Sequence, residues 1–305
     1  MKKTFFTNTL SVMIFALICT ALWGSATPFI KTGYLCLKVE ETPSIILFAG
    51  IRFTIAGILT VLIYSIIERK FLYPKKESMK YVGIISIFQT ILQYIFFYIG
   101  LANTSGVKGT ILSGSSAFFS ILIASLIFKQ EKINLKKIFA CIIGFAGVVL
   151  VNLNGLKLNF NFFGDAFVIF SAICLAFSSV FMKIYSKYES PVVLSGYQFF
   201  LGGLVMVTIG LSLGGTISFE SLKGIIILIY LAFLSAVAYA LWGMLLKNNP
   251  VSKVSIYSFM TPVFGVILSE FLLTEASAVP FLNVLVALVL ICIGIITINY
   301  QKKKF

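Results

Sequence analysis

The residues of this sequence that could do chemistry are the few charged and amide side chains placed within long apolar stretches. Arg52 and Glu270 each interrupt such a stretch, and Gln89 and Gln93 are spaced at i and i+4 in another. On a helix, that spacing brings the two amides to one face. A charged or amide group in apolar surroundings is costly, and it is retained where it pairs helices or binds a ligand. These residues are therefore candidates either for pairing helices or for recognising and moving a solute.

The sequence does not predict an enzyme active site. It contains no histidine, and its five cysteines lack the spacing of a metal or redox motif. There is no glycine-rich phosphate loop with its lysine, and no pair of carboxylates suited to acid and base work. We therefore expect no catalytic residue, no metal site and no cofactor. Without histidine, any coupling to protons would fall to a carboxylate.

The composition indicates an integral membrane protein. Of 305 residues, 59% are hydrophobic and 11% are charged, and the mean hydropathy is +1.05. This is more apolar surface than one water-soluble core buries. The net charge of +14 does not predict a nucleic-acid partner, because the 24 lysines and arginines lie mostly between apolar runs. The expected surroundings are a lipid bilayer.

Ten apolar runs are long enough to cross a bilayer, which takes about 20 residues. The first run follows Lys2 and Lys3, as a signal peptide would, but it lacks a small-residue cleavage site and is long enough to span. The predicted fold class is an all-α integral membrane protein with ten transmembrane helices. They cover residues 10–30, 43–67, 80–101, 106–128, 135–153, 162–182, 191–213, 224–246, 254–273 and 281–299.

The positive residues determine the predicted orientation. The connections 68–80 and 129–137 and the C-terminal residues 302–304 are rich in lysine and arginine, and all three lie on the side of the N-terminus. Positive residues concentrate on the cytoplasmic side of a membrane. Both termini of this multi-pass protein are therefore predicted to be cytoplasmic, with the protein in the cell membrane.

The second half of the chain repeats the first at an offset of 145 residues. Tyr94 falls on Tyr239, and the stretch 110–130 shares a helical face of small residues with 255–275. Small residues let membrane helices or a solute approach closely. Since each half holds five helices, an odd number, the second half enters the membrane from the opposite side. We predict two inverted five-helix repeats, 1–155 and 156–305, which are typical of secondary transporters.

Several short motifs in register with these helices resemble a known family. They are Trp23-Gly24-Ser25 with Pro28 and Lys31, Arg52-Phe53, Tyr197 to Gly203, and Pro262 followed by Glu275. Over nearly its whole length the chain is similar to EamA-type transporters of the drug/metabolite transporter superfamily. The resemblance implies a ten-helix exporter of small metabolites whose first, third, fourth, sixth, eighth and ninth helices surround a central cavity. Ala117 and Leu175 depart from it, since many members have a proline and a tryptophan there.

Polarity and aromatic character select the candidates for the cavity. The Gln89 and Gln93 amides occur only in the first half, and they bind either a ligand or a neighbouring helix. Aromatic residues offer ring faces to cations or aromatic solutes, with packing as the alternative. The predicted substrate-binding residues are Trp23, Gln89, Gln93, Tyr94, Tyr98, Ser113, Ser116, Tyr239, Trp242 and Ser258.

Four residues are candidates for gating or coupling. Lys108 and Lys253 begin equivalent helices in opposite orientations; they either extend their amines to the interface or guard the two mouths of the cavity. Pro262 removes a backbone hydrogen bond to Ser258 and predicts a stronger bend in the ninth helix than in the fourth. Glu270 is the coupling candidate, with an interfacial or ion-paired carboxylate as the alternative.

Three other charged residues are predicted to be structural. Arg52 lies well inside the second helix, where a guanidinium must face the bundle interior, so helix pairing is favoured over substrate contact. Asp165 and Glu275 stand near helix ends and are predicted to be interfacial.

The predicted function is secondary transport across the cell membrane, with export of a small organic metabolite such as an amino acid by alternating access. Uptake or facilitated exchange is one alternative, and a non-transporting scaffold or sensor is another. The expected partners are a small-molecule substrate and the lipid bilayer. Ala140 and Gly144 give the fifth helix a small face that packs either within the chain or in a possible homodimer.

Overall fold

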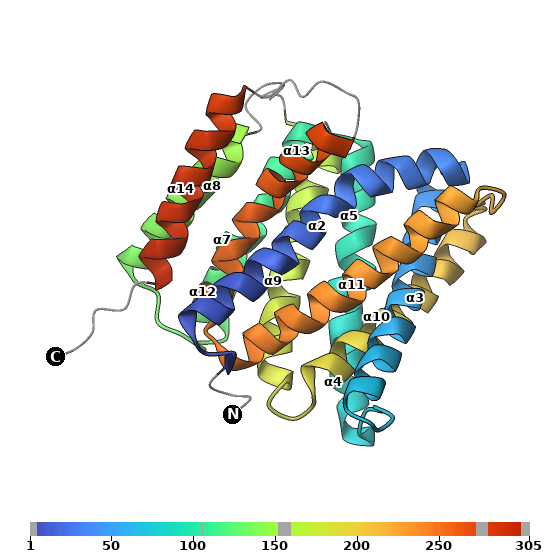
Figure 1. Cartoon of the computed structure of the whole chain (residues 1–305), viewed down its shortest axis with the longest axis horizontal. Coiled ribbons are helices and arrows are strands. Elements are labelled where there is room, and N and C mark those ends of the chain that lie inside the picture. The colour runs from blue at the N-terminus through green and yellow to red at the C-terminus, as the bar shows by residue number, and fades with distance from the viewer. Residues whose placement is uncertain (1–4, 105, 152–159, 273–279, 300–305) are drawn as a thin grey trace.

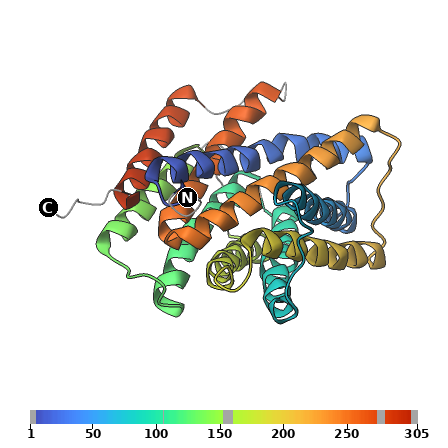
Figure 2. The ribbon, with the colours of Figure 1, turned by 60° about the horizontal axis from the view of Figure 1, so that its bottom comes forward.

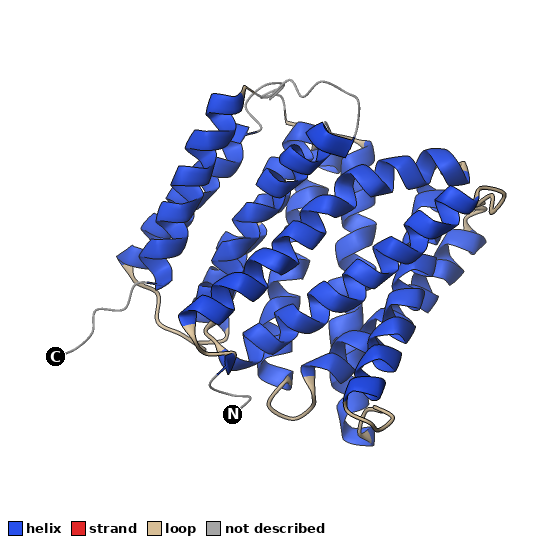
Figure 3. Ribbon diagram, viewed as in Figure 1, coloured by secondary structure: helices blue, strands red, loops and turns tan. Residues whose placement is uncertain are grey.

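A computed structural model describes residues 5–104, 106–151, 160–272 and 280–299. Every regular element in these ranges is a helix (Figure 3). Nine of the helical segments are at least 18 residues long and apolar enough to cross a membrane, and α8 adds a tenth segment of 17 residues. The predicted fold class is confirmed.

Ten spanning segments follow one another along the chain, and several are built from more than one element. Segments one and two are α2 (Thr9–Leu37) and α3 (Thr42–Ile67). Segment three joins η1 (Lys76–Ser78), α4 (Met79–Ile85), η2 (Ser86–Leu92) and α5 (Gln93–Ala102), and segment four joins α6 (Gly106–Gly114), α7 (Ser116–Leu122) and η3 (Ile123–Ile127). Segment five is α8 (Leu135–Val151), and segment six joins η4 (Phe162–Ala166) and α9 (Phe167–Tyr185). Segments seven and eight are α10 (Pro191–Ser212) and α11 (Leu222–Asn248). Segment nine joins α12 (Val251–Ser255), η5 (Ile256–Phe259) and α13 (Met260–Leu272), and segment ten is α14 (Phe281–Asn299).

The two halves pack as inverted copies of one another. Helix α3 packs along its equivalent α10, and α8 along its equivalent α14, which together form one end of the molecule in Figure 1. Helix α2 packs on α11 and α13, and its equivalent α9 packs on α5 and α7 in the same way. Figure 2 shows α2 and α11 running side by side. If the halves are exchanged, the pairs α3–α10 and α8–α14 each map onto themselves. The contacts of α2 map onto those of α9.

Two side-chain contacts mark the approximate two-fold axis between the halves. The rings of Phe53 and Phe199, equivalent residues of α3 and α10, stack with centroids 5.1 Å apart and planes inclined by 3°. The hydroxyls of Tyr94 and Tyr239, also equivalent, are 3.1 Å apart. A residue can contact its own equivalent only on the axis that relates the halves.

Close backbone packing along this axis requires glycine in α3 and α10. A Cβ on Gly57 would lie 2.5 Å from the Phe200 nitrogen, and a Cβ on the equivalent Gly203 would lie 2.4 Å from the Thr54 nitrogen. These distances are too short for any side chain. The same approach therefore occurs twice, once from each half.

Segments four and nine are interrupted at equivalent positions. The ninth contains the 3₁₀ turn η5, after which α13 begins at Met260. The fourth is interrupted at Ser115, whose hydroxyl and amide both donate to the Leu112 carbonyl, at 2.5 Å and 3.1 Å. Serine bonding of this kind tightens a turn and bends a helix without proline. An interruption therefore occurs in both segments, with and without a proline, and the stronger bend of the ninth stays a prediction.

The small face of α8 is used within the chain. Gly144 contacts the Phe259 ring, and a Cβ on Gly294 of α14 would lie 2.7 Å from the Ala140 carbonyl oxygen. Sequence analysis predicted that this face packs either within the chain or in a homodimer, and in the structure it packs within the chain.

Candidate functional site

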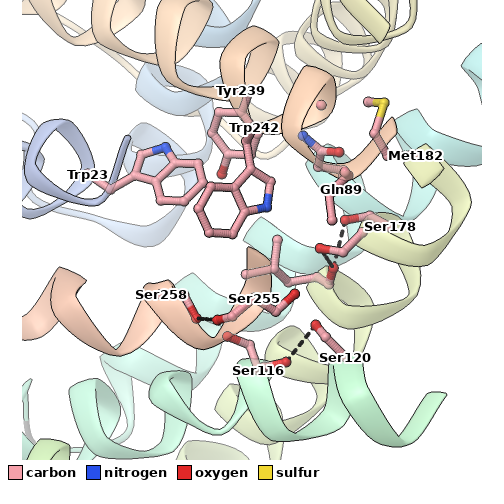
Figure 4. A pocket seen from close by; sticks show the side chains of 14 residues that line it. Trp23, Gln89, Ser116, Ser120, Ser178, Met182, Tyr239, Trp242, Ser255 and Ser258 are labelled. Carbon is pink, nitrogen blue, oxygen red and sulfur yellow. Dashed lines mark hydrogen bonds between the residues drawn. The ribbon is translucent and has the colours of Figure 1, made fainter. Parts of the chain in front are cut away.

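A small pocket of about 40 Å³ lies between the two halves (Figure 4). Six segments contribute to its wall: the first, third, fourth, sixth, eighth and ninth, the same six that the family resemblance implied. The lining residues are Trp23, Gln89, Ser116, Ser120, Leu175, Ser178, Ser179, Met182, Tyr239, Trp242, Gly243, Leu246, Ser255 and Ser258. Ligand pockets for organic molecules measure roughly 300–1,000 Å³. The described conformation is therefore a narrow one, and a metabolite fits only after the wall moves.

One wall of the pocket is aromatic. The Trp23 ring centroid is 4.9 Å from that of Trp242 and 5.0 Å from that of Tyr239. The planes of these pairs are inclined by 62° and 58°, so their edges and faces meet. Such pairs hold aromatic side chains in defined positions. Figure 4 shows the three rings gathered on one side of the pocket.

The opposite wall consists of serines from segments four, six and nine. Most of their hydroxyl protons bind carbonyls of their own helices. Ser120 donates to the Ser116 carbonyl at 2.7 Å, and Ser178 donates to the Leu175 carbonyl at 2.8 Å. Ser179 donates to the same Leu175 carbonyl at 3.0 Å, and Ser258 to the Ser255 carbonyl at 2.7 Å.

Two polar groups on the pocket wall are buried without a hydrogen-bond partner among the described residues. They are the Ser255 hydroxyl and the Trp23 indole N–H. Ser255 is 3% exposed. Because an unpaired buried polar group is costly, groups of this kind commonly serve a ligand or ordered water.

The structure brings six of the predicted substrate-binding residues into the pocket. These are Trp23, Gln89, Ser116, Tyr239, Trp242 and Ser258. The resemblance implied that this sixth segment, α9, faces the cavity, but sequence reasoning named none of its lining residues, such as Ser178 and Ser179. The adjacent serines within an apolar helix were the available signal.

The other four predicted residues, Gln93, Tyr94, Tyr98 and Ser113, do not line the pocket. Gln89 lies within the π-helical element η2, where hydrogen bonds skip one more residue than in an α-helix. The π segment alters the helical register, so Gln89 lines the pocket and Gln93 lies beside the Tyr239 hydroxyl. The predicted common face for both amides at the cavity is therefore wrong.

Arg52 lies between helices and not in the pocket. It is 3% exposed, and it donates to the Ser235 hydroxyl at 2.9 Å and to the Leu231 carbonyl at 3.3 Å. Its guanidinium carbon lies 5.0 Å from the Phe53 ring centroid. These contacts connect α3 to α11 and fit a structural role.

Lys108 and Lys253 have different surroundings despite their equivalent positions. Lys108 pairs with Asp165 at 2.5 Å, and the Asp165 side chain is only 1% exposed. Thr104 also donates to Asp165, at 2.7 Å. The prediction of an interfacial Asp165 is thus wrong, because Lys108 and Thr104 allow the carboxylate to be buried. Lys253 is half-buried and has no ion pair to any described residue.

Pro262 and Glu270 are the remaining candidates for gating and coupling. Pro262 is in the first turn of α13, beyond the pocket residues of the ninth segment. The Glu270 side chain and the whole of Glu275 lie outside the described residues.

One end of the pocket is closed by hydrogen bonds between two helices of the second half. Met182 and Leu246 line the pocket at this end. The Lys183 amine donates to the Leu246 carbonyl at 3.1 Å and to the Asn249 carbonyl at 2.5 Å, which joins α9 to the end of α11. We call this region the Lys183 end.

A second set of bonds closes the same end. Glu131, in the connection before α8, accepts from the Ser252 amide at 2.9 Å and also from the Ser252 hydroxyl. Lys137 pairs with Glu131 at 2.5 Å. Ser252 lies in the first turn of α12, where a carboxylate is favoured by the helix dipole.

Two inverted five-helix halves around a central pocket define the class of membrane transporters with inverted repeats. The model of the EamA-like transporter family matches residues 10–153 and 162–300. The chain belongs to this family, and the resemblance predicted from its motifs is confirmed. It is a multi-pass membrane transporter.

Relatives and a solved structure agree with this assignment. An uncharacterized transporter of Archaeoglobus fulgidus is 29% identical over 269 residues, which are 86% of this chain and 90% of that protein. The uncharacterized transporter YetK of Bacillus subtilis is 26% identical over 275 residues, 88% of this chain and 82% of YetK. One crystal structure superimposes with a TM-score of 0.76 over 95% of this chain and 96% of that chain, at 16% identity. This last likeness concerns the fold alone.

Proposed function

We propose that this protein is a secondary transporter that moves a small organic metabolite out of the cell by alternating access. The observation that carries the proposal is that two sets of polar bonds, one within the second half and one between the halves, close one end of the central pocket. In an inverted repeat, the Lys183 bonds have an equivalent position at the other end, where bonds of the same kind would close the pocket in the opposite state.

The equivalent positions are defined by the repeat. Lys183 corresponds to Lys31, and the Leu246 and Asn249 carbonyls correspond to those of Leu101 and Thr104. Lys31 is exposed. The opposite state would bring Lys31 to these carbonyls and release Lys183.

The direction of transport follows from the predicted orientation. The Lys183 end lies on the side of the lysine-rich connections, which the positive-inside rule assigns to the cytoplasm of the cell membrane. The described conformation is then closed to the cytoplasm. An amino acid or a related metabolite is the substrate class that we carry over from the family resemblance. The lining residues carry no carboxylate or amine side chain, so Glu270 keeps its place as the candidate for proton coupling.

Accessibility measurements in proteoliposomes test alternating access. A cysteine at Ser179, on the pocket wall, is labelled with a membrane-impermeant thiol reagent from each side, with the unsubstituted protein as background. Lys183→Met is expected to raise labelling from the Lys183 end several-fold, while the exposed neighbour Lys187→Met is the control and leaves it unchanged. Equal labelling in both variants would contradict closure by Lys183.

Flux measurements separate transport from the alternatives. Protein in liposomes is expected to accelerate exchange of an amino acid or related metabolite above empty vesicles, and Lys183→Met is expected to alter that rate. A scaffold or sensor would accelerate none. Flux that requires loading from the extracytoplasmic side alone would favour uptake.

A further inference from the structure

We propose that the pocket selects solutes that present N–H donors and carry no net negative charge, such as a primary amine or amide joined to a flat apolar group. This inference rests on the proposed transport function and adds the chemical class of the substrate. It comes from the hydrogen bonds of the serine wall.

A serine hydroxyl has one proton and two lone pairs. Ser120, Ser178, Ser179 and Ser258 each direct that proton to a carbonyl of their own helix. Their oxygens therefore offer lone pairs to the pocket and have no proton left to donate. A wall of this kind matches a ligand that donates hydrogen bonds.

The unpartnered Ser255 hydroxyl extends this wall. It is 3% exposed, lines the pocket and has no hydrogen-bond partner among the described residues. Ser116 lines the pocket beside it and is 7% exposed. An amine with two or three protons would be shared among such oxygens, because each N–H needs a separate acceptor.

The aromatic wall favours the same ligand. Ring faces attract a cation or the positive edge of an N–H group. The Trp23 indole N–H is an unpartnered donor on the described lining, and it is suited to a single carbonyl, as in an amide. Trp23 and Trp242 also offer apolar surface for a flat group.

An anion meets the opposite conditions. No lysine or arginine is among the described residues that line the pocket, so the carboxylate of a solute without its own ammonium group would lose its hydration without a cation in exchange. It would also face the serine lone pairs. The Lys183 amine, which follows the lining residue Met182 in the chain, is bound to two carbonyls at the closed end.

Tryptophan fluorescence gives a direct measure of binding. The chain has two tryptophans, and both line the pocket. Purified protein is titrated with three solutes of the same skeleton: 3-phenylpropylamine, 3-phenylpropionamide and 3-phenylpropionate. The amine and the amide are expected to change the emission with dissociation constants about tenfold or more below that of the carboxylate, since one charge-assisted hydrogen bond accounts for about this ratio. Equal or tighter binding of the carboxylate would overturn the proposal.

A matched pair of serine variants tests whether the serine wall is responsible. Ser116→Ala removes a lining hydroxyl, whereas Ser113→Ala removes one on the same segment that donates to the Gly109 carbonyl at 2.7 Å and does not line the pocket. In the double variant Ser116→Ala with Ser255→Ala, amine binding is expected to weaken about tenfold, and carboxylate binding should change by less than about twofold. In the Ser113→Ala control, amine binding should also change by less than about twofold. Unchanged amine binding in the double variant would refute the serine wall.

Flux of the same solutes distinguishes the two proposals. Amine-selective binding without any carrier-dependent flux would support the pocket chemistry and contradict transport. Carrier-dependent flux that prefers the carboxylate would support transport and contradict the pocket chemistry.

Discussion

Two equivalent sets of polar contacts, which we call joints, connect the halves, and they differ in chemistry. In the first copy, Arg52 of α3 donates to the Ser235 hydroxyl and the Leu231 carbonyl of α11. In the second copy, Gln198 of α10 accepts from the Thr90 hydroxyl at 2.6 Å. Gln198 occupies the position of Arg52, and Thr90 that of Ser235.

The second joint also bonds the residues equivalent to Arg52 and Leu231, with donor and acceptor exchanged. The Ser86 hydroxyl donates to the Gln198 carbonyl at 2.9 Å, and Ser86 is the equivalent of Leu231, whose carbonyl accepts from Arg52. The comparison teaches that the repeat preserves where the helices are joined, while the charge of the joint has diverged. Four predictions test how far this equivalence extends.

The largest effect is expected at the charged joint. Arg52→Ala removes a buried side chain with both hydrogen bonds and should lower the free energy of unfolding by about 4 kcal/mol. Arg52→Gln copies the neutral joint and removes a buried charge, so its stability should stay within about 1 kcal/mol of the parent. Thermal unfolding in detergent compares the two. Equal losses in both variants would show that the charge itself holds the joint.

The equivalent lysines, Lys108 and Lys253, should give the next largest difference in stability. Lys108→Met leaves the buried Asp165 without its cation and should cost about 3 kcal/mol. Lys253→Met removes an amine that has no ion pair to a described residue and should cost much less. Asp165→Asn combined with Lys108→Met should recover much of the loss, because no uncompensated charge remains. Comparable melting temperatures for both single lysine variants would contradict this assignment.

The glycine contacts test whether equivalent positions have equal energies. Gly57→Ala and Gly203→Ala each place a Cβ against backbone atoms, and each should cost about 2 kcal/mol. Gly83→Ala is the control, because a Cβ there has nothing within 4 Å, and it should leave stability unchanged or slightly higher. Unequal losses at Gly57 and Gly203 would break the equivalence of the two copies.

The smallest effect is expected at the surface. Lys38 and Glu220 form an ion pair at 3.0 Å, with side chains 70% and 80% exposed. Exposed pairs of this kind contribute little. Glu220→Gln should leave the melting temperature unchanged, in contrast to the buried Lys108–Asp165 pair. A measurable loss would show that exposure alone does not separate the two pairs.

The sequence predicts the fold well because the lengths of the apolar runs and the internal repeat can both be recognised in a single sequence. It predicts part of the site for the same reason: Trp242, Tyr239 and Ser258 lie on faces that the repeat identifies. It does not predict the π segment that separates Gln89 from Gln93, since such a change of register has no simple sequence signal. The burial of Asp165 likewise depends on Lys108 and Thr104, which belong to another segment.

The contacts on the two-fold axis also bear on how the two copies were able to diverge. In a pair of identical half-length chains, Phe53 or Tyr94 would meet its own copy, and one mutation would alter both partners at once. In this single chain, Phe199 and Tyr239 are inherited separately from the residues they touch. One side of each axial contact is therefore free to change alone. The same independence allowed a guanidinium on one half of the axis and an amide on the other.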